Sequence, residues 1–381
     1  MASDDYIVFG APAFDDADIE EVIDSIKNGW VGTGPKVHAF EKIFADYKGV
    51  PVEHVAAVSS CTAALHLSMV AAGISEGDEV ITTAMTFCAT VNAIVHTGAT
   101  PVLVDIDVNT KNIDASLIEQ AITEKTKAIL PVHFSGLMCD MASILALADK
   151  YDLAVIEDCA HAIESERDGF NAGTLGDFGC FSFYATKNIT TAEGGMVIGK
   201  DIEAVARIKR LALHGLSDDA WSRYSDNGFK TYTVADCGFK YNLTDLHAAL
   251  GINQLKRVDE LWQRRKKAWD YYCAEIDANK YLLPAEVGAG ARHGYHLFTL
   301  QRLGESVSRD FIMNQLHKAG VGAGIHYLSI PEHEYYHRTY GFSVDDYPNA
   351  RDHGMHSFSI PLSANLTQAQ LQKIVSLLND I

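Results

Sequence analysis

The 381-residue sequence predicts an α/β fold, in which a large, mainly parallel sheet lies between helices and a smaller C-terminal α+β domain follows. Three observations predict this fold. Short apolar runs alternate with helical patterns from about residue 15 to residue 215. Hydrophobic residues make up 48% of the chain, which is enough for a large core. The pattern then changes to one long helix and a shorter mixed segment.

Each element of the alternating part is expected from its local pattern. Asp15 and Asp16 cap an amphipathic helix that ends at Gly29. Parallel strands end at one edge of their sheet, and α/β proteins bind ligands at this edge. Further helices are expected at 62–72, 88–95, 115–122 and 141–151, and strands at 54–59, 79–83, 101–105, 128–132, 153–157, 179–184 and 196–198.

The second part of the chain begins with a long helix, expected from Asp245 to about Ile276. Its basic run at 264–267 predicts a solvated face. The sequence therefore predicts two domains, with the N-terminal segment and the large sheet in residues 1–245, and the connecting helix and small domain in residues 246–381. The small domain is expected to contain a strand near 295–301, a helix near 309–319 and a last helix from about Gln368.

The composition argues against several classes of protein. The net charge of -19 disfavours binding to nucleic acid or to an anionic membrane, although a local basic pocket can still bind an anionic small substrate. The seven cysteines are scattered without a CxxC pair, which is typical of reduced thiols in a cytoplasmic protein. No signal peptide is visible, and the uncharged stretch 81–104 is too rich in threonine for a membrane span.

One lysine and one aspartate form the pattern that points to chemistry. Lys187 follows the apolar strand expected at 179–184, and Asp158 follows the strand expected at 153–157. Taken singly, a surface lysine and a helix-capping aspartate are the simpler interpretations. Together they indicate a pyridoxal 5'-phosphate (PLP) enzyme. Its lysine holds the aldehyde as a Schiff base, and its carboxylate keeps the pyridine nitrogen protonated so that the ring accepts electrons.

Other residues are candidates for the rest of a cofactor site. Residues 59–63 join a strand to a helix start, where backbone N–H groups and a hydroxyl can bind phosphate, although Thr62 could equally cap the helix. Ser182, five residues before Lys187, could add a second hydroxyl. Phe87 follows a strand end and could stack on the pyridine ring, although an aromatic residue at such a place is more often part of a core.

Several further motifs follow one another in a fixed order along nearly the whole chain. With them, the chain resembles the DegT/DnrJ/EryC1/StrS family of sugar aminotransferases, which have the PLP fold type I of aspartate aminotransferase. The matching segments are 29–35 (GWVGTGP), 59–64 (SSCTAA), 77–81 (GDEVI), 98–102 (GATPV), 157–161 (EDCAH), 182–195 and 360–362 (IPL).

The resemblance implies a role for each matching residue. Lys187 would be the Schiff-base lysine and the base that moves a proton between the sugar carbon and the cofactor. Asp158 would pair with the pyridine nitrogen, and His161 would lie beside the cofactor. The residues implied to bind the phosphate are Thr62, Ala63 and Ser182, the residue implied to stack on the ring is Phe87, and those implied to line the nucleotide-sugar pocket are Trp30, Val31, Thr33, His326 and Tyr327.

The resemblance also implies a homodimer with shared active sites, because in this family a loop from the partner subunit completes each phosphate site. Residues 238–242 match that loop. Many members have Asn at the place of Lys240 and Arg at the place of Asn242, so either residue could reach the phosphate here. With 214–216 and 219–221, this version is most similar to the branch that acts on UDP-4-ketopentose in lipid A modification. Similar sequences act on UDP-4-keto-6-deoxy-N-acetylglucosamine.

The resemblance therefore implies a cytoplasmic aminotransferase that moves an amino group to C4 of a nucleotide-linked 4-keto sugar. Glutamate is the expected donor, and the kinetics would be ping-pong through a pyridoxamine phosphate form. The product would enter surface polysaccharide or lipid A. The sequence leaves open which sugar it is, whether the nucleotide is UDP or dTDP, and the stereochemistry at C4.

Three alternatives compete with this interpretation. His333, Glu334 and His337 fit HExxH, in which two histidines on one helix face bind zinc in a hydrolase, but no later glutamate can serve as the third ligand. A sugar dehydratase of the same family would carry histidine in place of Lys187. A catalytically inactive regulatory relative would not be expected to keep this lysine together with Asp158.

Overall fold

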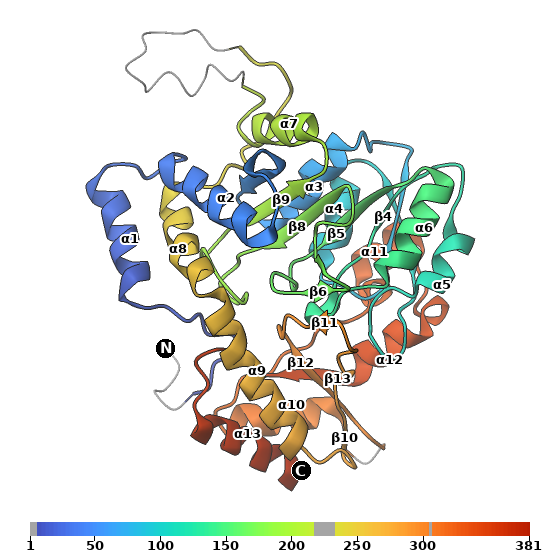
Figure 1. Ribbon diagram of the computed structural model, residues 1–381. Helices are drawn as coiled ribbons and strands as arrows, with labels where there is room; N and C mark the ends of the chain where they lie inside the picture. Colours follow the sequence, from blue (N-terminus) through green and yellow to red (C-terminus); the bar gives the residue numbers. More distant parts are fainter. Residues whose placement is uncertain (1–5, 217–232, 305–306) are drawn as a thin grey trace.

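The computed structural model describes residues 6–216, 233–304 and 307–381. Its central sheet has seven strands in the order β1-β9-β8-β5-β4-β2-β3, of which β9, β8, β5 and β4 are labelled in Figure 1. Of these seven, β9 alone runs antiparallel to its neighbours. The predicted α/β fold with a mainly parallel sheet is therefore confirmed. The strands are β1 (Val55–Val58), β2 (Glu79–Thr83), β3 (Thr100–Val104), β4 (Thr126–Leu130), β5 (Ala154–Asp158), β8 (Phe178–Ser182) and β9 (Gly195–Gly199).

Helices cover both faces of this sheet (Figure 1). Successive strand residues point to opposite faces, so Phe181 packs into one core and Cys180 into the other. Burial on both sides explains why the strands are continuous apolar runs. The first core receives α2 (Pro35–Lys48), α6 (Met141–Tyr151) and α8 (Asp245–Lys256), and the second receives α3 (Cys61–Ala71), α4 (Cys88–His96) and α7 (Ile202–Ala212).

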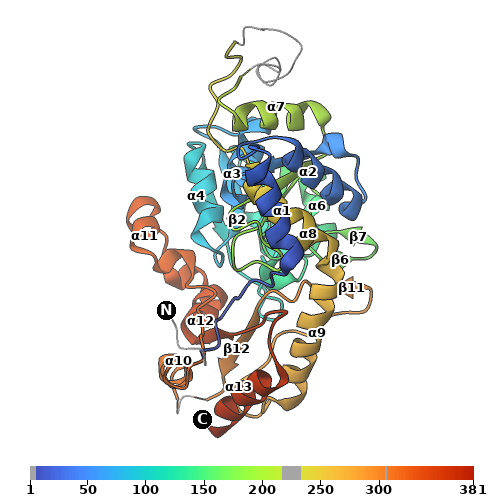
Figure 2. The ribbon, with the colours of Figure 1, turned by 90° about the vertical axis from the view of Figure 1, so that its left-hand side faces the viewer.

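The C-terminal part forms a separate, smaller layer below the large sheet (Figure 2). Its antiparallel sheet has the order β10-β12-β13. Ile7 packs into the same core and pairs with Val321, so the N-terminal segment crosses to this layer. The domain boundary at residue 245 stays a prediction. The elements of this layer are α9 (Val258–Glu275), β10 (Tyr281–Leu282), β12 (Phe298–Arg302), α10 (Arg309–Lys318), β13 (Ser357–Ile360) and α13 (Gln368–Asp380).

The remaining elements lie between or beside these layers. Residues of α1 pack on α8, and Asp15 forms a capping box with Asp18 at the start of α1. Among the described residues, no helix combines the length and apolar character that a membrane span requires. The remaining elements are α1 (Asp16–Lys27), α5 (Ala115–Ile118), β6 (Glu166–Arg167), β7 (Phe170–Asn171), β11 (Ala291–Arg292), α11 (Glu334–Tyr340) and α12 (Pro348–His356).

The long helix expected from Asp245 to Ile276 is in fact two helices, α8 and α9, which meet at Arg257. The Arg257 guanidinium fixes this junction by donating to the carbonyl of Ala13 and to Asp18 Oδ2, at 3.0 and 2.6 Å. The basic run 264–267 is also not a uniform solvated face, because Arg265 is only 2% exposed. Both departures depend on partners far away in the sequence.

Lys48, the last residue of α2, is a buried lysine. Its Nζ donates to the carbonyls of Ile163 and Ala172 at 2.8 and 3.1 Å, and lies 4.6 Å from the centre of the Phe181 ring. Burial lowers the pKa of its ammonium group to about 8. An unfolded lysine has a pKa near 10.4, so between about pH 8 and pH 10 the unfolded chain binds more protons than the folded protein.

We therefore expect the contribution of Lys48 to stability to become more favourable as the pH rises through this window. Lys48→Met should remove this dependence, which cannot exceed about 1.4 kcal/mol per pH unit for one proton. Urea unfolding of wild type and variant at several pH values between 7.5 and 10 measures the difference in slope. Lys42→Met, at an exposed position of the same helix, is the matched control. Equal slopes in wild type and Lys48→Met would contradict the assignment.

Candidate active site

A cavity of about 410 Å³ opens at the carboxyl ends of β5 and β8. It brings together predicted residues from five separate stretches of the chain. These residues are Thr62, Phe87, Asp158, His161, Ser182, Lys187, His326 and Tyr327. A cavity therefore lies at the edge of the sheet where the strand pattern predicted ligand binding. Lys187 and Asp158 both line this cavity.

Asp158, the last residue of β5, is 4% exposed. Thr90 donates to its Oδ2 at 2.8 Å and the amide of Ala160 to its Oδ1 at 3.1 Å. Burial raises the pKa of this carboxyl group, while these hydrogen bonds and the nearby Lys187 oppose the shift. Among the described residues it has no ion-pair partner. A protonated pyridine nitrogen would supply the missing opposite charge, so the site fits PLP at this end.

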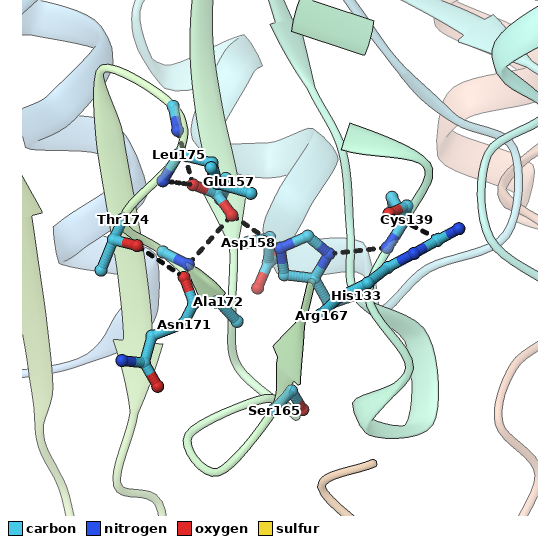
Figure 3. Close-up of polar contacts among 12 residues, drawn as sticks. His133, Cys139, Glu157, Asp158, Ser165, Arg167, Asn171, Ala172, Thr174 and Leu175 are labelled. Atoms are coloured by element: carbon cyan, nitrogen blue, oxygen red, sulfur yellow. Dashed lines mark hydrogen bonds and ion pairs between the residues drawn. The ribbon is translucent and has the colours of Figure 1, made fainter. Parts of the chain in front are cut away.

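A buried histidine and glutamate brace the strand end behind Asp158 (Figure 3). Glu157 accepts hydrogen bonds from His133 Nε2 at 2.9 Å and from the amides of Gly173, Leu175 and Gly176. His133 Nδ1 in turn accepts from the amide of Cys139 at 3.1 Å. His133 and Glu157 lie near the Cys159 thiol, as a metal site would require, but both ring nitrogens and both carboxylate oxygens already have protein partners. The cluster is therefore a structural support for β5.

Lys187 lies in the turn that follows β8, where its amide donates to the carbonyl of Tyr184 at 2.9 Å. Burial lowers the pKa of its amine, and the charges of Cys61 and Asp158 oppose this shift. A lowered pKa leaves a larger fraction of the amine neutral and nucleophilic near neutral pH. Lys187 is also the only lysine or arginine among the described residues that line the cavity.

The start of α3 forms another wall. Ser60, rather than Thr62, is the N-cap, and its Oγ accepts from the amide of Ala63 at 3.1 Å. Gly195 lies so close that a Cβ there would be 2.4 Å from the carbonyl carbon of Ser60. Thr62 and Ser182 line the cavity, whereas Ala63 is buried behind it. The two hydroxyls and the helix N-terminus suit a phosphate group.

Aromatic side chains close the opposite side. Phe87 is 55% exposed, and its ring centre lies 5.8 Å from that of Tyr327. His161 Nδ1 accepts from the amide of Ser135 at 3.2 Å, and burial lowers the pKa of this ring well below its usual value. The neutral ring must therefore carry its proton on Nε2, which donates to Tyr327 Oη at 3.2 Å. The Tyr327 hydroxyl proton is left free for a ligand.

A family model of the DegT/DnrJ/EryC1/StrS aminotransferases matches residues 12–379. The chain belongs to this family. Spore coat polysaccharide biosynthesis protein SpsC of Bacillus subtilis is 41% identical over 99% of this chain and 97% of its own length. The UDP-4-amino-4-deoxy-L-arabinose–oxoglutarate aminotransferase of Shewanella sediminis is 36% identical over 100% of this chain and 99% of its own.

Solved structures agree with the family match. The sugar aminotransferase Spr1654 of Streptococcus pneumoniae, in its PLP form, superposes with a TM-score of 0.92 at 33% identity, covering 98% of both chains. A pyridoxamine phosphate form of the same protein matches with a TM-score of 0.91 at 34% identity over 98% of this chain and 97% of that chain. The predicted fold type I, transaminase activity and PLP cofactor of this family member are thereby confirmed. The zinc hydrolase alternative is wrong, and His333 precedes the first residue of α11 instead of sharing a helix face with His337.

Ala63 and five other predicted residues do not line the cavity of this family member. Trp30, Thr33 and Asn242 line a second cavity of about 450 Å³, where Asn242 Nδ2 donates to Thr33 Oγ1 at 2.6 Å. Val31 is 48% exposed and Lys240 is exposed, and neither lines either cavity. The matching segment 219–221 lies outside the described residues. One chain alone therefore does not bring its loop 238–242 to its own Lys187.

The sequence did not predict that threonines lie behind Asp158, and it did not predict several of the residues that line the cavity. Thr86 Oγ1 lies 2.8 Å from Thr90 Oγ1, and Thr90 holds Asp158, so a chain of hydroxyls supports the carboxylate. Their spacing of four residues on a largely apolar segment was an available signal, because buried hydroxyls need polar partners. Cys61 and Glu193 also line the cavity; they lie in the matching segments 59–64 and 182–195, but nothing in the local pattern singled them out.

Proposed function

We propose that this protein transfers an amino group, with glutamate as donor, to C4 of a nucleotide-linked 4-keto sugar. The observation that carries the catalytic part is the single cavity shared by Lys187 and Asp158. The sugar part is supported by relatives whose names refer to polysaccharide biosynthesis and to a 4-amino sugar nucleotide. The product would enter a surface polysaccharide or lipid A. Seven unpaired cysteines support a reducing, cytoplasmic setting.

Five residues that line the cavity have a role in this proposal. The bound cofactor supplies an electron sink that stabilises negative charge on the carbon losing its proton. The Lys187 amine would hold the cofactor aldehyde and, when free, would accept and return the proton of the sugar carbon. Asp158 would keep a proton at the ring nitrogen, and Phe87, which also lines the cavity, would pack on the ring. Tyr327, aimed by His161, donates its hydroxyl proton to a bound oxygen.

The part of the cavity that would bind the cofactor phosphate is the reason to propose a homodimer with shared sites. Thr62, Ser182 and the amides at the start of α3, Ala63 included, offer hydrogen bonds, but the described lining residues supply no cation other than Lys187. A doubly charged phosphate is better bound when a cation or further amide groups are added. The loop 238–242 of a second subunit would supply them through Lys240 or Asn242. Trp30, Val31 and Thr33 would then serve the sugar pocket of the partner, opposite His326 and Tyr327.

Subunit complementation tests this sharing. Lys187→Ala and the double variant Lys240→Ala, Asn242→Ala should each be nearly inactive alone. After subunit exchange, each mixed dimer combines one doubly damaged site with one intact site, so we expect activity to return to roughly a quarter of the wild-type level if exchange is random. Exchange is followed with two affinity tags. Demonstrated exchange without recovered activity would mean that each site belongs to a single chain.

A panel of 4-keto sugars bound to UDP or dTDP, assayed with glutamate, tests the substrate class. Formation of a 4-amino nucleotide sugar from at least one of them is expected. The dehydratase alternative predicts loss of a hydroxyl from the sugar without stable amine incorporation, so mass spectrometry of the product separates the two. Transamination of simple keto acids alone, with no reaction of any nucleotide sugar, would contradict the proposal.

A further inference from the structure

We propose that Asn188 is a positioning residue that fixes the direction of the Lys187 side chain, and that the buried pair Glu164–Arg265 anchors it. This inference rests on the proposed role of Lys187. Lys187 has a long, flexible side chain, and Asn188 is the next residue in the chain. Fixing Asn188 in place therefore restricts the backbone conformation at Lys187, and with it the direction in which the amine points.

The side chain of Asn188 uses both of its amide protons and its carbonyl oxygen. Nδ2 donates to Glu164 Oε2 and to the carbonyl of Gly294, each at 2.7 Å. Oδ1 lies 2.9 Å from His296 Nδ1, which must donate because Oδ1 can only accept. Three partners from two separate segments therefore hold one side chain, Glu164 from the first and Gly294 and His296 from the second, and no rotation about its torsions can preserve all of these bonds.

Arg265 of α9 also contacts Asn188 and its partner Glu164. Its guanidinium binds Glu164 Oε1 and also donates to the backbone carbonyl of Asn188 at 3.4 Å. Arg265 and Glu164 are each only 2% exposed. A buried ion pair is costly to desolvate and adds little net stability, so its presence beside Lys187 calls for another explanation. Fixing the turn that carries the reactive lysine is such an explanation.

His296 connects the hydrogen bonds of Asn188 to the residues that line the cavity. Its ring centre lies 4.3 Å from that of His161, the residue that orients Tyr327. Asn188 is thus linked to both sides of the site, to Lys187 through the chain and to Tyr327 through two neighbouring histidine rings that are tilted by 33°. Small displacements of such groups matter, because an error of about 1 Å in a reacting group can cost about 100-fold in rate.

The test compares Asn188→Ala and Glu164→Gln with a matched control, Asp18→Asn. Asp18 is also fully buried and paired with an arginine, Arg257 at 2.6 Å, but it contacts none of the residues around Lys187. PLP is added to each apoprotein, and absorbance follows the rate of lysine attachment and the pH midpoint of the lysine-bound cofactor. Thermal unfolding of the apoproteins measures the general loss of stability.

We expect attachment to slow by about tenfold or more in Asn188→Ala and Glu164→Gln, with a shifted pH midpoint. Asp18→Asn should lose thermal stability but keep the wild-type rate and midpoint. If borohydride reduction labels Lys187 in the wild type and both variants attach PLP like the wild type, the inference on Asn188 is wrong. Labelling of a different lysine in the wild type would instead overturn the proposed function.

Discussion

Lys187→Ala is expected to abolish transamination. In the proposed function, this substitution removes both the amine that would hold the cofactor and the group that would move the proton, so two roles are lost together. Positioned proton transfer alone contributes about 10² to 10⁴-fold to enzymatic rates, and the loss should be at least of this size. The measurement is the half-reaction with glutamate, followed by absorbance of the bound cofactor under single-turnover conditions.

Lys187→Arg is the matched control for this variant. Arginine keeps a positive charge in the cavity but stays protonated and cannot act as a nucleophile. It should be as inactive as alanine if the chemistry of the amine matters, and substantially active if the lysine only neutralises charge. Turnover of Lys187→Ala within about tenfold of the wild type would contradict the assignment, because one tenth of the rate corresponds to only about 1.4 kcal/mol.

Asp158→Asn is expected to lower the rate of transamination by about 10²-fold or more, as for other lost electrostatic partners. The carboxylate is buried, accepts from Thr90 and Ala160, and lacks an ion-pair partner among the described residues, so a ring cation fits it. Asparagine keeps the size of the side chain and the bond from Thr90, but leaves the ring nitrogen easily deprotonated. The variant should therefore fold normally and bind PLP.

Thr90→Val is the matched control, because it removes one hydrogen bond to Asp158 but retains the negative charge. Its loss of rate should be clearly smaller than that of Asp158→Asn. Single-turnover rates with glutamate, measured for both variants, give the comparison. Near-normal turnover in Asp158→Asn would show that the carboxylate has another task than holding a proton on the ring.

The fold was predictable because its signals are local. Strands buried on both faces are apolar runs, and the turn between β8 and β9 carries Lys187 at a place that the strand pattern fixes. The pairing of Lys187 with Asp158 followed from the rule that parallel strands end at one edge. Fold class and central pair therefore both came from short stretches of sequence.

The rest of the site depends on contacts that no local pattern encodes. Arg265 looked like part of a solvated basic run, yet its partner Glu164 lies about a hundred residues away. The break at Arg257 has no glycine or proline to mark it. The resemblance implies that Trp30 and Thr33 line the sugar pocket, but their own chain places them in a different cavity, as the proposed shared site would require.

Borohydride reduction of the PLP-bound protein, followed by peptide mapping, directly tests whether Lys187 is the residue that holds the cofactor. Reduction converts the bond between the lysine and the cofactor into a stable amine, so the modified residue can be identified by mass spectrometry. The Schiff-base role of Lys187 predicts a single pyridoxyl label on this residue, in the peptide that also contains Asn188. A label on any other lysine, or a PLP-bound protein without a reducible bond, would contradict it.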